Sequence, residues 1–136
     1  MQYILKLGDW PNELNESSWK IVKSPGATVQ AYTLALRQAE AASRILPFNP
    51  EILDTLAAAQ YRLGKYADVV KTTAISCERR GEPSIPSTTF LAMAQFKLGD
   101  IAKARASLGE LQKKIKQQRV SKSSLLEEAE SLLGSH

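Results

Sequence analysis

A pattern that occurs twice constrains the fold of this chain more than any other feature of its sequence. Residues 53–69 read LDTLAAAQYRLGKYADV, and residues 88–104 read TTFLAMAQFKLGDIAKA. Small, apolar and turn-forming residues coincide when the copies are aligned, and the aligned glycines, Gly64 and Gly99, are 99 − 64 = 35 positions apart. Self-similarity at a period of about 20–50 residues is the signature of a repeat architecture. We therefore expect a chain built from repeated structural units.

Each copy predicts two helices joined by a tight turn. Apolar residues recur three and four positions apart before the glycine and again after it, as on one face of an amphipathic helix. Gly64 and Gly99 suit the left-handed conformation at a helix end, and Asp100 is expected to be the N-cap of the next helix. Ala57 and Ala92 are small enough for the two helices to approach closely. The copies thus predict antiparallel helical hairpins.

These residues resemble the tetratricopeptide repeat. The central repeat matches that family's pattern at Leu53, Leu56, Ala57, Gly64 and Tyr66, and the next repeat matches it at Leu91, Ala92, Gly99 and Ala104. Three residues depart from the family pattern but are similar in volume to the residues that it prefers, namely Val69, Thr88 and Ile101. The resemblance implies an all-α fold in which hairpins stack as a right-handed superhelix, an α–α solenoid. The sequence of the second copy is similar to bacterial segments of this family that often belong to larger regulatory proteins.

The whole chain, residues 1–136, is expected to form a single domain of this kind. A divergent first repeat covers 9–47 and holds a loop insertion at 23–28, where Ser24, Pro25 and Gly26 interrupt the helical pattern. The second repeat covers 50–81 and the third covers 85–118. Residues 122–133 are expected to form a C-terminal capping helix that covers the apolar end of the stack.

Residue types that carry most catalytic chemistry are scarce. His136 is the only histidine and Cys77 the only cysteine, so no histidine-based triad or two-histidine zinc site can form inside the fold. The phosphate-binding Gly-Lys-Ser/Thr loop and the dinucleotide-binding glycine pattern do not occur. Cys77 is expected to be a packed small side chain. We therefore expect a protein that is not an enzyme, with no catalytic residue, no cofactor and no metal.

The sequence also bears on location. No apolar run approaches the roughly 20 residues that span a bilayer, and the first ten residues do not resemble a secretory signal. A single cysteine fits a reducing compartment. We expect a cytoplasmic monomer that does not associate with membranes.

The family resemblance implies that the first helices of the repeats line a concave groove for a protein or peptide partner. Four residues on that face are Val22, Lys23, Glu51 and Thr55. The ten residues most expected to contact the partner are Asn15, Trp19, Asp54, Ala58, Tyr61, Arg62, Thr89, Met93, Phe96 and Lys97. Arg62 and Lys97 would pair with acidic groups on the partner, while aromatic and methionine side chains would give adaptable apolar contact.

An uneven charge distribution leaves a second function class open. Between residues 97 and 122 the chain has eight basic and two acidic residues, a local excess of 8 − 2 = 6 positive charges. Such a surface could bind nucleic acid or an acidic protein. Nucleic acid is the less expected of the two, because the basic residues lack interleaved aromatics. The glutamates Glu127, Glu128 and Glu130 are interpreted as a solvated face of the last helix.

Overall fold

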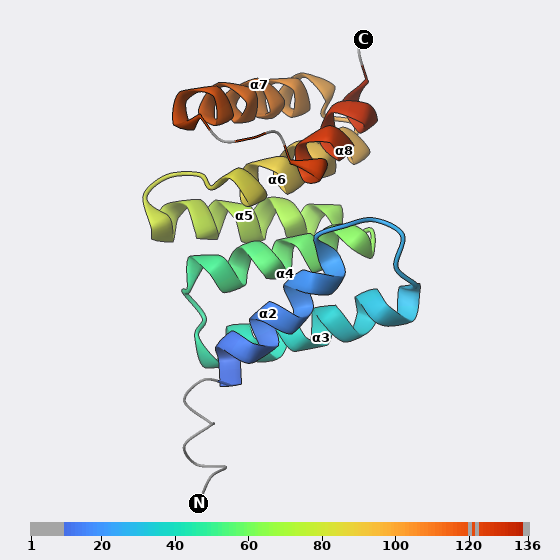
Figure 1. Ribbon diagram of the computed structural model, residues 1–136, viewed down its shortest axis with the longest axis vertical. Helices are drawn as coiled ribbons and strands as arrows, with labels where there is room; N and C mark the ends of the chain where they lie inside the picture. Colours follow the sequence, from blue (N-terminus) through green and yellow to red (C-terminus); the bar gives the residue numbers. More distant parts are fainter. Residues whose placement is uncertain (1–9, 120, 122, 135–136) are drawn as a thin grey trace, which may run out of the picture.

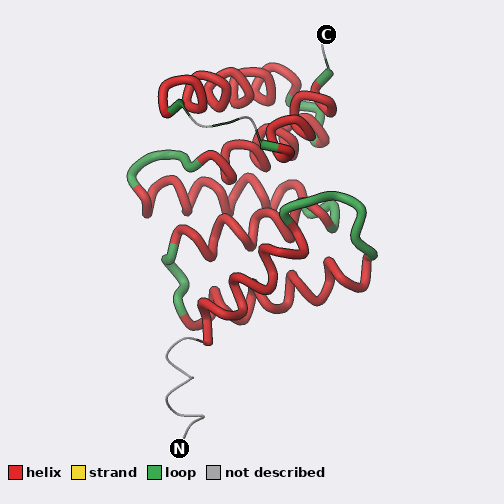
Figure 2. Tube along the Cα trace, viewed as in Figure 1, coloured by secondary structure: helices red, strands yellow, loops and turns green. Residues whose placement is uncertain are grey.

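The computed structural model describes residues 10–119, 121 and 123–134, and in that range helices joined by loops are the only regular secondary structure (Figures 1 and 2). The helices are α2 (Trp10–Val22), α3 (Val29–Ile45), α4 (Pro50–Arg62), α5 (Tyr66–Arg80), α6 (Ile85–Lys97), α7 (Ile101–Gln118) and α8 (Ser124–Leu133). The prediction of an all-α fold is confirmed. Asp9 and Lys122, at the edges of the first repeat and the capping helix, lie outside the described residues, as does His136.

The helix boundaries follow from local capping chemistry. Gly64 and Gly99 have φ angles of 78° and 87°, the left-handed conformation expected where α4 and α6 end. The hydroxyls of Ser84 and Ser123 accept hydrogen bonds from the first turns of α6 and α8. Asp100 occupies the N-cap position of α7 but its side chain makes no capping hydrogen bond. The predicted N-cap position is therefore confirmed, and α7 begins where expected.

Helices that follow one another in the chain pack together from α2 to α8, and α3 to α7 succeed one another along the long axis of the molecule (Figure 1). A second set of contacts joins every other helix, α2 with α4, α4 with α6, and α6 with α8. The even-numbered helices thus share one side of the molecule. The functional residues described below lie on that side.

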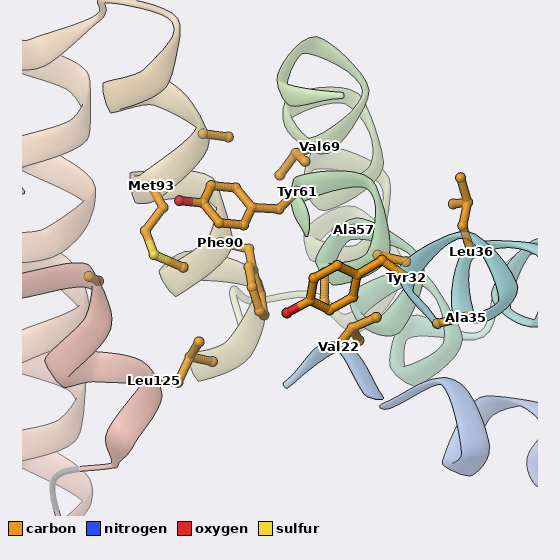
Figure 3. Packing of buried hydrophobic residues seen from close by; sticks show 14 residues of the cluster. Val22, Tyr32, Ala35, Leu36, Ala57, Tyr61, Val69, Phe90, Met93 and Leu125 are labelled. Atoms are coloured by element: carbon orange, nitrogen blue, oxygen red, sulfur yellow. The ribbon is translucent and has the colours of Figure 1, made fainter. Parts of the chain in front are cut away.

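The core runs along this side. Val22, Tyr61, Phe90, Met93 and Leu125 belong to one buried cluster, although they come from four different helices (Figure 3). A second cluster joins α8 to α7. In it, Leu126 packs with Leu111 and Ile115. The last helix therefore packs against α7 and also contributes to the core between α4 and α6.

Ala57 offers a test of how tightly the helices pack. It is fully buried in the main cluster. Replacing it with leucine is expected to overpack the core and lower the free energy of unfolding by about 1–3 kcal/mol. Urea denaturation followed by circular dichroism measures the change. Ala74→Leu, at an exposed site on α5, is the matched control and should change stability by less than about 0.5 kcal/mol. Equal stability of Ala57→Leu and the wild type would show that the site tolerates the larger side chain.

Candidate functional site

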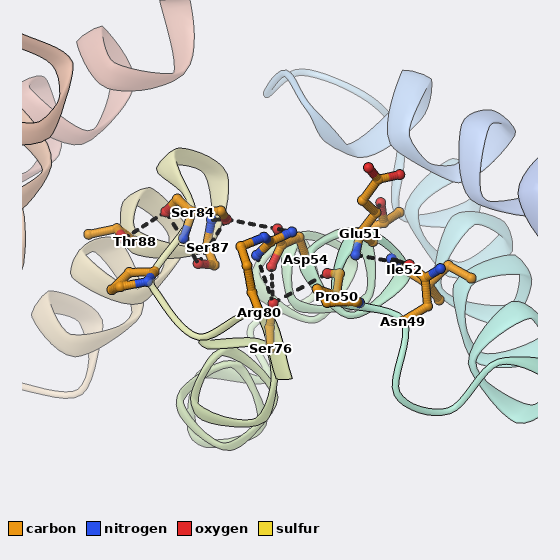
Figure 4. A network of polar contacts seen from close by, with 12 residues as sticks. Asn49, Pro50, Glu51, Ile52, Asp54, Ser76, Arg80, Ser84, Ser87 and Thr88 are labelled. Carbon is orange, nitrogen blue, oxygen red and sulfur yellow. Dashed lines mark hydrogen bonds and ion pairs between the residues drawn. The ribbon is translucent and has the colours of Figure 1, made fainter. Parts of the chain in front are cut away.

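Asp54 connects three helices, because its side chain on α4 binds residues of α5 and the N-cap of α6 (Figure 4). Its side chain comes from α4 and is buried, with 6% exposure for the residue. One carboxylate oxygen accepts a hydrogen bond from Ser76 Oγ of α5 at 2.5 Å, and the other accepts one from Ser84 Oγ at 2.7 Å. Arg80 Nη2 lies 3.0 Å from the second oxygen. The charge of Asp54 is therefore paired within the protein.

Arg62 forms a second junction, at the other end of α4. Its Nη1 and Nη2 donate to the two carboxylate oxygens of Glu128 at 2.5 and 2.8 Å, and its Nε donates to the carbonyl of Val22 at 2.8 Å. The guanidinium also lies 5.6 Å from the ring centre of Tyr61 and 5.5 Å from that of Phe90. Its side chain is 5% exposed. Arg62 is thus not available to an acidic peptide in this conformation.

Glu128 was expected to lie on a solvated face, and the structure corrects that interpretation. Its side chain is 21% exposed and forms a bidentate ion pair with Arg62. Helix α8 reaches α4 through this pair, 66 residues apart in sequence. The same helix brings Leu125 and Ala129 into the main core cluster. As a result, α8 covers part of the face that was expected to be an open groove.

The phenol of Tyr61 lies beside this ion pair, and its ionisation gives a pH test of the packing. Burial, followed by the negative charges of Glu128 and Tyr66, raises the pKa of Tyr61 from 10.0 to about 12, against an opposing effect of Arg62. Since the fold retains a proton that the unfolded chain loses, the contribution of Tyr61 to stability is complete below about pH 10 and is lost as pH rises toward 12.

Urea denaturation near pH 8 and near pH 11 measures this loss. Tyr61→Phe removes the ionisable hydroxyl, so its stability should fall less between the two pH values than that of the wild type. The two proteins differ only in the hydroxyl of Tyr61, so the difference between their losses of stability measures its contribution. An identical alkaline loss in the two proteins would contradict the raised pKa.

The ten residues expected to contact a partner differ in how accessible they are in the structure. Six are enclosed within the protein, namely Asp54, Ala58, Tyr61, Arg62, Thr89 and Met93. Val22 at the end of α2, and Leu125 and Ala129 of α8, belong to the same buried cluster as Ala58, Tyr61 and Met93. Asn15 and Trp19 are half-buried and line open space, to which Asp54 also contributes. Phe96 is half-buried and Lys97 is exposed, and neither lines the two hollows described next.

Two hollows lie side by side around Trp19. The first has a volume of about 290 Å³ and is lined by Asn15, Trp19, Glu51, Asp54, Thr55, Arg80, Ser84 and Pro86. The second has a volume of about 440 Å³ and is lined by Trp19, Lys23, Ser24, Ile85, Pro86, Ser123, Ser124 and Leu125. Because Trp19 and Pro86 line both, we treat the hollows as one surface and call it the Trp19 groove. It lies between α2, α4 and the first turns of α6 and α8.

The Trp19 groove is lined by an aromatic ring that packs on its neighbour and by polar groups that lack a partner. Trp19 packs edge to face on Phe90, with ring centres 6.4 Å apart. The Oδ1 atom of Asn15 is buried and has no hydrogen-bond partner among the described residues. A buried unpaired polar atom costs about 1–3 kcal/mol, and such costs are concentrated at functional sites. The side-chain charges of Glu51 and Lys23 also have no partner within the described part of the chain.

Sequence reasoning missed several residues of this groove. The residues expected to contact a partner did not include Arg80, Ser84, Ile85, Ser123 or Leu125, all of which line the groove. The spacing of Ser76 and Arg80 on α5 offered a signal, since residues four apart share a helix face and can together bind one buried carboxylate. No sequence signal identified Asp54 as that carboxylate.

The basic residues of the third repeat do not form one stripe in the described structure. Lys103 and Arg105 are both exposed on α7 but lie on nearly opposite sides of the helix, about 160° apart around its axis. Lys114 donates a hydrogen bond to the carbonyl of Pro83. Glu82 and Glu110 line the same hollow as Lys113 and Lys114. The positive charge is therefore spread around the helix and partly balanced by acidic neighbours.

Within the described ranges, no helix combines the length and apolar character needed to cross a bilayer. The described histidine, cysteine, aspartate and glutamate residues form no group of three or more that could hold a metal ion. Comparison of the chain with protein-family models, curated proteins and solved structures gives no match.

Proposed function

We propose that this chain is a non-catalytic protein–protein interaction scaffold that binds a peptide segment of a partner in the Trp19 groove. The observation that carries the proposal is the position of Trp19, a half-buried aromatic ring that lines two adjoining hollows and is fixed by Phe90. Rigid aromatic side chains in partly desolvated hollows are frequent hot spots of protein interfaces. An apolar side chain of the partner would pack on Trp19 and Pro86.

The proposed architecture is a right-handed solenoid of tetratricopeptide-like hairpins, acting as a module of a larger protein or complex. The repeat in the sequence, the short glycine turns after α4 and α6, and the contacts between alternate helices support it. Such modules recruit partners, while any chemistry resides elsewhere. Binding of nucleic acid or an acidic protein by the third repeat stays an untested alternative, and the spread of its charges around α7 favours the groove instead.

Replacing Trp19 tests the proposal. Trp19→Ala is expected to weaken partner binding at least tenfold, because a hot-spot residue contributes about 2 kcal/mol or more. The matched control is Trp10→Ala, which removes an exposed tryptophan at the start of α2 that lines neither hollow. Partners are captured from cell lysate with the wild type, identified, produced separately, and titrated against all three proteins.

A second measurement guards against loss of folding in Trp19→Ala. Trp10→Phe leaves Trp19 as the only indole, since the chain has two tryptophans. The emission of Trp19 should then change as the purified partner is added. Wild-type affinity in Trp19→Ala would place the interface outside the Trp19 groove. So would an emission spectrum of Trp10→Phe that does not change when the partner binds.

A further inference from the structure

The Trp19 groove differs in charge between its two ends. Three charged residues line the first hollow, Glu51, Asp54 and Arg80, and their formal charges sum to −1. Asp54 and Arg80 pair with each other at 3.0 Å, so the uncompensated charge is that of Glu51. Figure 4 shows the side chain of Glu51 extending away from the hydrogen-bonded cluster around Asp54. This end of the groove therefore favours a cation.

The second hollow has the opposite preference. Among the described residues that line it, Lys23 alone is charged, and it is exposed just beyond the end of α2. No ion pair involves Lys23 within the part of the chain that the structure describes. The rest of the lining is apolar or carries hydroxyl groups. This end therefore favours an anion.

Trp19 and Pro86 separate the two charges, because both residues line both hollows. We propose that the groove selects a peptide segment with a basic side chain at one end, an apolar side chain in the middle and an acidic side chain at the other end. The basic side chain would enter the hollow of Glu51, where the ring of Trp19 can also attract a cation. The acidic side chain would lie beside Lys23.

This inference rests on the proposed function and reverses part of the sequence-based expectation. Arg62 and Lys97 were expected to pair with acidic groups on the partner, but Arg62 is enclosed and paired with Glu128, and the exposed Lys97 lines neither hollow. Among the described residues that line the groove, Glu51 and Lys23 remain as the charges without an ion-pair partner. Since Glu51 and Lys23 have opposite charges and line different hollows, they also determine the direction in which the peptide lies in the groove.

Selection of a random peptide library displayed on phage tests the inference without a known partner. The wild type, Trp19→Ala, and the exchange variant Glu51→Lys with Lys23→Glu are used as separate targets. Both exchanged positions are exposed, so the exchange variant should fold normally, which circular dichroism checks. The wild type is expected to enrich peptides with opposite charges flanking an apolar residue, and the exchange variant the same pattern in the reverse order.

Titration of the enriched peptides gives the size of the effect. Neutralising one charge, by Glu51→Gln or Lys23→Gln, should weaken binding about fivefold, the upper range for a solvent-exposed ion pair. Peptides that need Trp19 but keep the same charge order with the exchange variant would overturn the inference and leave the proposed function standing. Failure of the wild type to enrich any peptide beyond Trp19→Ala would overturn both.

Discussion

Replacing Arg62 with alanine is expected to lower the free energy of unfolding by about 2–4 kcal/mol, slightly below the cost of breaking a fully buried ion pair because Glu128 keeps some contact with water. The arginine is 5% exposed and Glu128 is 21% exposed. Without Arg62, Glu128 loses both of its short hydrogen bonds and the carbonyl of Val22 loses its side-chain donor. Urea denaturation measures the change.

Lys97 supplies an internal control, because it occupies the same place in the next repeat, 97 − 62 = 35 positions further on. It is exposed, so Lys97→Ala should change stability by less than about 0.5 kcal/mol. Arg62→Lys keeps the charge but cannot form the bidentate pair, and should fall between the two. A loss below about 1 kcal/mol in Arg62→Ala would mean that the pair contributes no more than a surface salt bridge.

Replacing Asp54 with alanine is expected to cost about 2–3 kcal/mol, because a buried carboxylate with charge-assisted hydrogen bonds is lost and its partners stay behind. Ser76, Ser84 and Arg80 would lose a shared acceptor, and α4, α5 and the N-cap of α6 would lose their common contact. Thermal and urea unfolding measure the change.

Glu51→Ala is the control for Asp54→Ala, since Glu51 lies three residues earlier on the same helix and is exposed. It should leave stability nearly unchanged. Asp54→Asn tests the part played by charge, because the amide keeps the shape and one acceptor oxygen. If Asp54→Ala and Glu51→Ala were equally stable, the hydrogen bonds of Asp54 would not hold the helices together.

The helices could be predicted from the sequence because their determinants are local. Apolar spacing gives the buried face of each helix, and Gly64 and Gly99 mark the turns at which α4 and α6 end. Even so, local pattern does not determine whether a capping side chain is used. Asp100 shows this, since it stands at the N-cap without making the hydrogen bond.

The candidate site could be predicted only in part, because it depends on contacts between distant residues. The family resemblance predicted that Asn15, Trp19 and Asp54 lie on one face, and the three residues line the same hollow. The enclosure of Tyr61 and Arg62 depends on α8, whose Glu128 is 66 residues from Arg62. A repeat pattern shows which face of a helix points inward, but not how closely later helices approach that face.

The contacts that Arg62 makes with the end of α2 and with α8 bear on how the chain opens. In a one-dimensional array each unit touches only its neighbours, and end units can unravel separately. Here α8 cannot detach without breaking the ion pair between its Glu128 and Arg62 of α4. At the other end, the ring of Trp19 on α2 packs against Phe90 of α6. Fraying from either end is therefore expected to be coupled to the middle, so that amide hydrogens of α2 and α8 exchange about as slowly as those of the central helices.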